Sequence, residues 1–262
     1  MFTRREVLKL GTSAVIGSAA RSFGHKRNSA PVTESQKGDP EDAYEFVTYD
    51  PTVITEVVTR LPNKALFERW TRELPEAMIT VGRTFVGCSR ASTPSQISEF
   101  LSLFDLPIRD NNGYVAYCAA GLCFAGVTAY ANVLDKLHRA SSKLEQLKKL
   151  LPDVEHYYFY PTVSCVDMYY FAKAKRRWID YVPKRNTYPK RGWVVLYDWN
   201  ARGIPDHCGI VERSTATRMD TLEFNTTATI NGNQRNGGAV AERTRSYDHV
   251  LGFVVTDIPP NK

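Results

Sequence analysis

The residues most able to do chemistry in this sequence are its cysteines. There are five, Cys88, Cys118, Cys123, Cys165 and Cys208. An odd number leaves at least one thiol without an intramolecular disulfide partner, and their spacing does not reveal which of the others pair. The sequence does not contain the two CxxC pairs of a structural zinc ribbon. A reactive thiol is therefore the first possibility to consider.

Cys118 stands where a loop leads into a helix. The stretch "RDNNGY" is a loop signal, and "CAAGLCFAGVTAYANVLDKL", from Cys118 to Leu137, is rich in small residues without proline. At a helix N-terminus, the positive end of the dipole favours a thiolate, the nucleophilic form of cysteine. Cys118 is thus a candidate nucleophile, the alternative being a small buried apolar residue. Cys123 points about 140° away around the helix and is expected in the core.

The stretch "IPDHCGIVE" places His207 between Asp206 and Cys208. It could be a packed core residue, a metal ligand or the base for a nucleophile elsewhere. If this stretch is a strand, its side chains alternate, so Asp206 and Cys208 point away from His207. His207 and Cys208 then cannot bind one metal ion. A zinc site would need ligands from distant segments, and we predict no metal site and no cofactor.

The stretch "LEFN" predicts a second strand with the same alternation. Its apolar residues Leu222 and Phe224 would face the core, while Glu223 and Asn225 would share the other face. If this strand pairs with that of His207 through the turn "RSTATRMD", a carboxylate and an amide can orient the imidazole. A solvated sheet face is the alternative.

The remaining pattern places helices before strands. Helical spacing predicts two short helices within 51–74 and further helices near 93–104, 118–137, 141–153 and 164–182. After residue 189, short runs rich in Val, Ile and aromatic residues alternate with Gly, Asn and Asp, which indicates an antiparallel sheet. The predicted class is α+β, with N-terminal helices packed on a C-terminal antiparallel sheet.

The N-terminus has the layout of a bacterial export signal. Arg4 and Arg5 precede a moderately apolar stretch ending in small residues near Ala20, as in a twin-arginine signal peptide. We expect a signal at 1–20, a flexible linker at 21–45, a helical N-terminal region at 46–110 and a catalytic domain at 111–258. The expected location is the periplasm or the outside of the cell.

Charge and hydropathy exclude some classes of partner. Loss of residues 1–20 would remove two net positive charges from the formal +6 and leave +4. This mild surplus suits anionic cell-wall polymers and is too small to indicate nucleic-acid binding. The sequence contains no apolar run of the roughly 18 residues that a transmembrane helix requires.

Four stretches together resemble the CHAP family, cysteine, histidine-dependent amidohydrolases and peptidases that cut peptidoglycan. They are "YCAAGLCFAG", "YPKRGWVVLYDWNARGIPDHCGIVE", "DTLEFN" and "GGAVAERTRSYDHVLGFV". The resemblance implies a papain-like fold in which Cys118 is the nucleophile, His207 its base, and Glu223 and Asn225 complete the site without a cofactor. The chain departs from the family at Trp193, where aspartate is usual, and in a long segment after Cys118.

The expected function is hydrolysis of amide or peptide bonds in peptidoglycan, with peptidoglycan or its peptide stems as partner. A cysteine peptidase or amidase with another substrate is one alternative, and an inactive exported binding protein is another. The sequence identifies no immunity or inhibitor protein. Calcium, which some family members bind, is not expected, because "RDNNG" offers too few acidic ligands.

Export through the twin-arginine route can be tested by replacing Arg4 and Arg5 together with lysine. We expect the protein to remain in the cytoplasm, because the pair is the feature that the export route recognises. Cell fractionation measures the outcome, and Arg27→Lys, outside the predicted signal, is the control. Undiminished periplasmic protein in the double variant would contradict the assignment.

Overall fold

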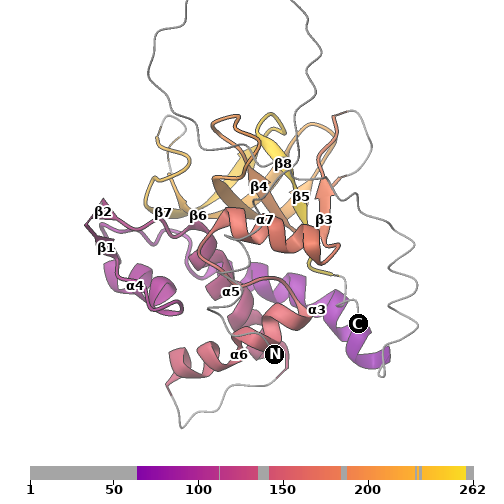
Figure 1. Ribbon diagram of the computed structural model, residues 1–262, viewed down its shortest axis with the longest axis horizontal. Helices are drawn as coiled ribbons and strands as arrows, with labels where there is room; N and C mark the ends of the chain where they lie inside the picture. Colours follow the sequence, from indigo (N-terminus) through magenta and orange to yellow (C-terminus); the bar gives the residue numbers. More distant parts are fainter. Residues whose placement is uncertain are drawn as a thin grey trace, which may run out of the picture. The chain divides into compact units, whose positions relative to one another are not determined.

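The computed structural model of the chain (Figure 1) describes residues 64–111, 113–134, 142–183, 188–227, 229 and 232–257. All of these fall within one compact unit, Glu45–Lys262. The predicted signal peptide at 1–20 and linker at 21–45 lie outside the described residues. Within the described part, no helix is both long and apolar enough to cross a membrane.

Five helices are described. They are α3 (Lys64–Arg83), α4 (Pro94–Ser102), α5 (Cys118–Val133), α6 (Lys143–Tyr157) and α7 (Cys165–Ala174). The helices predicted near 93–104, 118–137 and 141–153 correspond to α4, α5 and α6, although their bounds differ by a few residues. The helix predicted to end near Leu74 instead continues through Pro75 to Arg83, and the one predicted for 164–182 ends at Ala174.

A six-stranded antiparallel sheet forms the second half of the unit. Its strands are β3 (Trp178–Asp180), β4 (Val194–Tyr197), β5 (His207–Ser214), β6 (Met219–Thr226), β7 (Ala239–Arg245) and β8 (Val250–Val254), in the order β3-β8-β4-β5-β6-β7. The predicted pairing of β5 with β6 is confirmed. A small hairpin, β1 (Arg109–Asp110) with β2 (Gly113–Tyr114), occupies the predicted loop before Cys118. The described chain is therefore α+β.

The two faces of the sheet bury different clusters. Along β4, Val194 and Leu196 join the large core under the helices, whereas Val195 and Tyr197 belong to a smaller apolar cluster on the opposite face. This is the side-chain alternation expected of a strand buried on both faces. The sheet therefore separates a face covered by helices from a face on which polar residues can also be buried.

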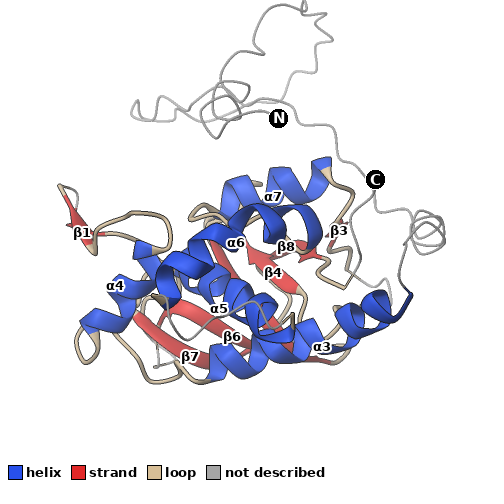
Figure 2. Cartoon of the chain, turned by 90° about the horizontal axis from the view of Figure 1, so that it is seen from below, coloured by secondary structure: helices blue, strands red, loops and turns tan. Residues whose placement is uncertain are grey.

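Helix α5 is the element on which the other helices assemble. It packs on β5 and β6 and contacts α3, α4 and α6, and Figure 2 shows it with α3 on one face of the sheet. Small residues allow this depth: Gly121 lies against the Phe224 ring and Gly126 against the Phe159 ring. Helices α3 and α4 contribute to the same core, so the described part of the predicted helical N-terminal region at 46–110 packs with the later helices and the sheet.

The close approach of α5 to β6 can be tested with Gly121→Ala. A Cβ there would lie 2.3 Å from Phe224 Cδ1 and 2.9 Å from its Cβ. We expect a loss of about 1–3 kcal/mol from overpacking, although alanine favours helix by about 1 kcal/mol. Urea unfolding measures the change.

Gly82→Ala in α3 is the matched control. Its Cβ would meet the Leu222 side chain first at Cδ2, the flexible end, with the next atoms 3.6 Å away. Because that methyl group can rotate away, we expect between no change and a gain of about 1 kcal/mol. Equal losses in the two variants would show that the ring of Phe224 does not limit the approach of α5.

Candidate functional site

Three cysteines from three distant segments meet at the ends of two helices. Cys118 is the first residue of α5, Cys165 the first of α7, and Cys208 the second of β5. Their sulfur atoms all lie within 4.8 Å of one another, and Cys118 Sγ lies 3.7 Å from Cys165 Sγ. We call these residues the cysteine cluster. Every described cysteine is a free thiol.

The position of Cys208 corrects a prediction from strand alternation. Cys208 does face the helical core, opposite to His207, as expected. It nevertheless belongs to the site, because the N-terminus of α5 lies against this end of β5 and brings Cys118 to it. Cys123 is buried and hydrogen-bonds with its sulfur to the Thr162 carbonyl at 3.2 Å, which confirms its predicted place in the core.

His207 is fully buried and is held through one nitrogen of its ring. Its Nε2 lies 3.1 Å from Oε2 of Glu223, on the neighbouring strand. The other nitrogen, Nδ1, has no hydrogen-bond partner of its own among the described residues, although the ring interacts with the thiol of Cys118. Asp206 is turned away and accepts from Trp199 N and Asn200 Nδ2. The predicted approach of Glu223 to His207 is confirmed.

Glu223 is a buried carboxylate surrounded by donors. Arg245 on β7 donates to both of its oxygens, through Nε to Oε1 at 2.8 Å and through a terminal nitrogen to Oε2. Thr221 donates its hydroxyl to Oε1 at 2.8 Å. Arg245 was not singled out from the sequence, because its register against β6 is fixed only when β7 pairs. The alternation within "AERTR" could have placed it on one face of a strand.

Gly209 makes the contact between His207 and Glu223 possible. It follows His207 by two positions and therefore lies on the same face of β5. A Cβ at Gly209 would stand 2.9 Å from Cγ of Glu223. The missing side chain thus leaves the space across which Glu223 extends to reach the imidazole.

Asn225 is not placed as the sequence predicts. Its backbone has a φ of 59°, and the pairing of β6 with β7 shifts register between Glu223 and Thr226. This bulge interrupts the alternation that would have put Glu223 and Asn225 side by side. The Asn225 amide donates to the carbonyl of Arg235 at 3.4 Å, while its Oδ1 is buried and has no partner in the described part of the chain.

Aromatic rings cover the His207 side of the sheet. The Tyr197 ring stacks on His207 with centroids 5.9 Å apart, and Trp199 stacks on Tyr197 at 5.4 Å. The Arg245 guanidinium lies 5.1 Å from the centre of the Trp199 ring. These rings exclude water from the charged groups, which strengthens their mutual interactions.

The charges of the site favour a thiolate beside an imidazolium. Interactions with Cys165, Cys208 and His207 hold the pKa of Cys118 well below its ordinary value, although burial opposes this. Burial lowers the pKa of His207, but its contacts with Cys118 and Glu223 outweigh this effect and raise it to about 9. Burial likewise raises the pKa of Glu223, which Arg245 and His207 bring down to about 2.

The thiols beside Cys118 behave in the opposite way. Their hydrogen bonds to Cys118 raise the pKa values of Cys165 and Cys208 well above the ordinary value. The raised pKa values favour the protonated form of both neighbours, in which each thiol can donate to the Cys118 sulfur. Cys118 also begins α5, which no side chain caps, so the helix dipole adds to the stabilisation of its negative charge.

The arrangement can present a nucleophilic sulfur, a positioned imidazole and an ionised carboxylate in sequence. No protein-family model, curated protein or solved structure matches the chain. The chemistry of the site is therefore argued from its own geometry.

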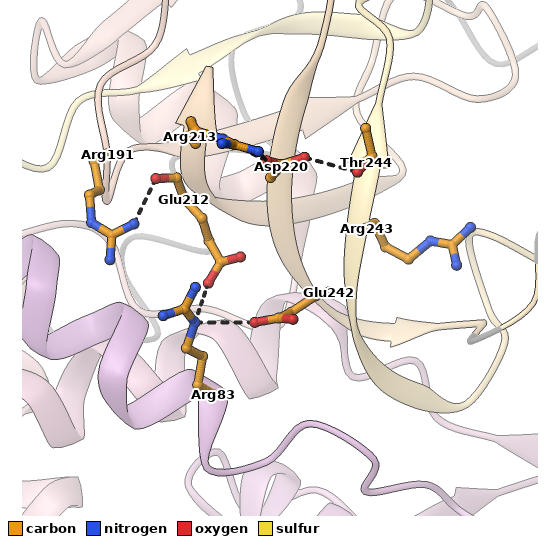
Figure 3. A pocket seen from close by; sticks show the side chains of 8 residues that line it. All are labelled: Arg83, Arg191, Glu212, Arg213, Asp220, Glu242, Arg243 and Thr244. Atoms are coloured by element: carbon orange, nitrogen blue, oxygen red, sulfur yellow. Dashed lines mark hydrogen bonds and ion pairs between the residues drawn. The ribbon is translucent and has the colours of Figure 1, made fainter. Parts of the chain in front are cut away.

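A polar pocket lies further along β5 (Figure 3). Its lining consists of Arg83, Arg191, Glu212, Arg213, Asp220, Glu242, Arg243 and Thr244. Arg83 pairs with both Glu212 and Glu242, and Arg213 pairs with Asp220. Glu212 is five residues beyond His207 on β5, roughly 17 Å at strand spacing. This pocket is a network of ion pairs around the buried Glu212, and none of its lining residues belongs to the cysteine cluster.

The role of Arg245 in holding the buried Glu223 can be tested with Arg245→Met. Removing one partner of a buried ion pair leaves a charge without compensation, and we expect a loss of about 3–5 kcal/mol. Arg213→Met is the control, because its pair with Asp220 is exposed and should contribute at most about 1 kcal/mol. Similar small losses in urea unfolding for both variants would show that Glu223 does not depend on Arg245.

Proposed function

We propose that the protein is a cysteine hydrolase that cleaves amide or peptide bonds by a Cys118–His207 thiol mechanism. The observation that carries this proposal is the chain of contacts from Cys118 through the His207 ring to Glu223, with a lowered pKa at the thiol and a raised pKa at the imidazole. A cysteine nucleophile, a histidine and a third group that orients the histidine make up the general arrangement of thiol catalysis.

In the proposed reaction, the Cys118 sulfur attacks the carbonyl carbon and forms a C–S bond. The negative charge moves to the carbonyl oxygen, where the backbone N–H of Cys118 can stabilise it. His207 gives its proton to the leaving nitrogen as the C–N bond breaks, which leaves a thioester. Water then attacks the thioester, His207 takes up the water proton, and the carboxylic acid departs as the C–S bond breaks.

In this mechanism Glu223 is a positioning residue. Its contact with Nε2 fixes the ring so that Nδ1 remains available to the sulfur, and its charge stabilises the imidazolium. Arg245 keeps that carboxylate ionised. We place no step at Asn225, because its amide side chain is engaged at the bulge.

Peptidoglycan is the substrate that we propose. The resemblance to the CHAP family and the sequence pattern of an exported protein support it together, and a papain-like arrangement is compatible with the α+β class. A cysteine peptidase or amidase acting elsewhere would use the same site. An exported binding protein without activity would have no need of a lowered pKa at Cys118.

The mechanism can be tested with Cys118→Ala and His207→Ala on isolated cell walls, by following the release of amines. We expect each variant to lose at least about a thousandfold in rate, because the residues act as one unit. Cys88→Ala is the control, since Cys88 lies outside the cysteine cluster. Iodoacetamide should label Cys118 first in the wild type.

Two outcomes would contradict different parts of the proposal. Full activity in Cys118→Ala would show that the nucleophile lies elsewhere. No release from cell walls, together with cleavage of simple peptide or amide substrates that requires Cys118, would leave the mechanism standing and reject peptidoglycan. Thermal unfolding shows that each variant is folded before its rate is compared.

A further inference from the structure

The cysteine cluster contains more sulfur than a thiol hydrolase requires. One cysteine suffices as a nucleophile, yet Cys118 is joined by two further buried thiols from separate elements. A single disulfide would leave the third sulfur without a partner. The proposed hydrolysis therefore does not explain why three free thiols lie together.

The spacing of the sulfur atoms fits a thiophilic metal ion. Zinc binds thiolate sulfur at about 2.3 Å in tetrahedral geometry, which separates neighbouring sulfur atoms by about 3.8 Å. Cys118 Sγ and Cys165 Sγ are 3.7 Å apart. The other two separations do not exceed 4.8 Å, so shifts of about 1 Å or less would bring all three sulfur atoms into coordination.

The surroundings favour the negative charge of three thiolates. Two helices, α5 and α7, begin at Cys118 and Cys165, so the positive ends of both helix dipoles meet at the cluster. A fully buried ring, that of His207, also approaches Cys118 and carries a nitrogen without a hydrogen-bond partner of its own. The imidazole can therefore donate to a coordinated sulfur without itself being a ligand.

The three cysteines are all buried and differ slightly in exposure. Cys208 is fully buried, whereas Cys118 and Cys165 retain 6% and 7% of their surface exposed. A fourth ligand such as water would complete the tetrahedral coordination of an ion held by the three sulfur atoms. Three thiolates select soft ions such as Zn²⁺ or Cu⁺ over Mg²⁺ and Ca²⁺.

We propose that Cys118, Cys165 and Cys208 form a binding site for one thiophilic metal ion, of the Zn²⁺ or Cu⁺ class. Binding would transfer the thiol protons to the buffer, without any redox step. The bound ion would occupy the sulfur electrons that the proposed hydrolysis needs, so a metal-loaded protein would not attack an amide. The site itself does not depend on the hydrolase being correct.

The test uses the full chain, reduced with a phosphine, and titrates it with Co²⁺ as a spectroscopic probe for the Zn²⁺ site. We expect one equivalent to produce thiolate-to-Co²⁺ charge-transfer absorption, and Zn²⁺ to displace it. Cys165→Ser should weaken Co²⁺ binding by at least about tenfold. Cys88→Ser should bind like the wild type, because Cys88 is outside the cluster.

Alkylation of the wild-type protein gives a second measurement that needs no variant to fold. Saturating Zn²⁺ should protect Cys118 and Cys165 from iodoacetamide and leave Cys88 reactive. Absent charge-transfer absorption, equal loss in Cys88→Ser and Cys165→Ser, or unprotected Cys118 would each overturn the site. Because these readouts do not involve hydrolysis, failure of the metal site and failure of the proposed enzyme are distinguishable.

Discussion

The buried charge of Glu223 is the constraint on which the site depends. A carboxylate with no exposed surface is costly unless donors surround it, and here they come from three strands: His207 on β5, Thr221 on β6 and Arg245 on β7. Any slip in register between these strands would leave the charge without partners. The requirement to satisfy one carboxylate therefore fixes the sheet and, through it, the orientation of the imidazole.

The second constraint is the depth at which α5 lies. Almost all of its residues are buried, and its glycines allow the ring of Phe224 to approach the helix backbone. Bulky side chains at those positions would raise the helix from the sheet and separate Cys118 from His207. Because α5 is apolar on all sides, it can lie deep in the core, and its N-terminus therefore lies beside the start of β5.

Much of this arrangement could be predicted from local patterns. The start of a helix at Cys118, the pairing of β5 with β6 and the approach of Glu223 to His207 follow from loop signals and alternation with period two. The ends of the elements follow less directly from these patterns. The strand at Trp178 was predicted as helix, because a short β3 after a helix leaves little pattern of its own.

The predictions that failed relied on local alternation at positions where a β-bulge or contacts between distant elements decide the placement of the side chain. Alternation assigned Asn225 to the face of Glu223, but a residue with positive φ creates a bulge there. Alternation correctly predicted that Cys208 points away from His207. The N-terminus of α5 nevertheless lies beside the first residues of β5, so Cys118 interacts both with Cys208 and with His207. Cys165 joins the cysteine cluster from the start of α7, 47 positions after Cys118. Sequence spacing does not reveal this contact.

The contacts of the cysteine cluster are compatible with two proposed roles of the Cys118 sulfur, as a nucleophile and as a metal ligand. The contacts of Cys118 with Cys165 and Cys208 lower the pKa of its thiol and so favour the thiolate that the proposed nucleophile requires. If these two neighbours lose their protons, the same three sulfur atoms become ligands, and the negative charge is neutralised by a cation instead of by His207. Because Cys165 and Cys208 must lose their thiol protons before they can coordinate an ion, the two states exclude each other. The features that support the proposed nucleophile, two helix N-termini and two neighbouring thiols, are those that would hold a soft metal ion.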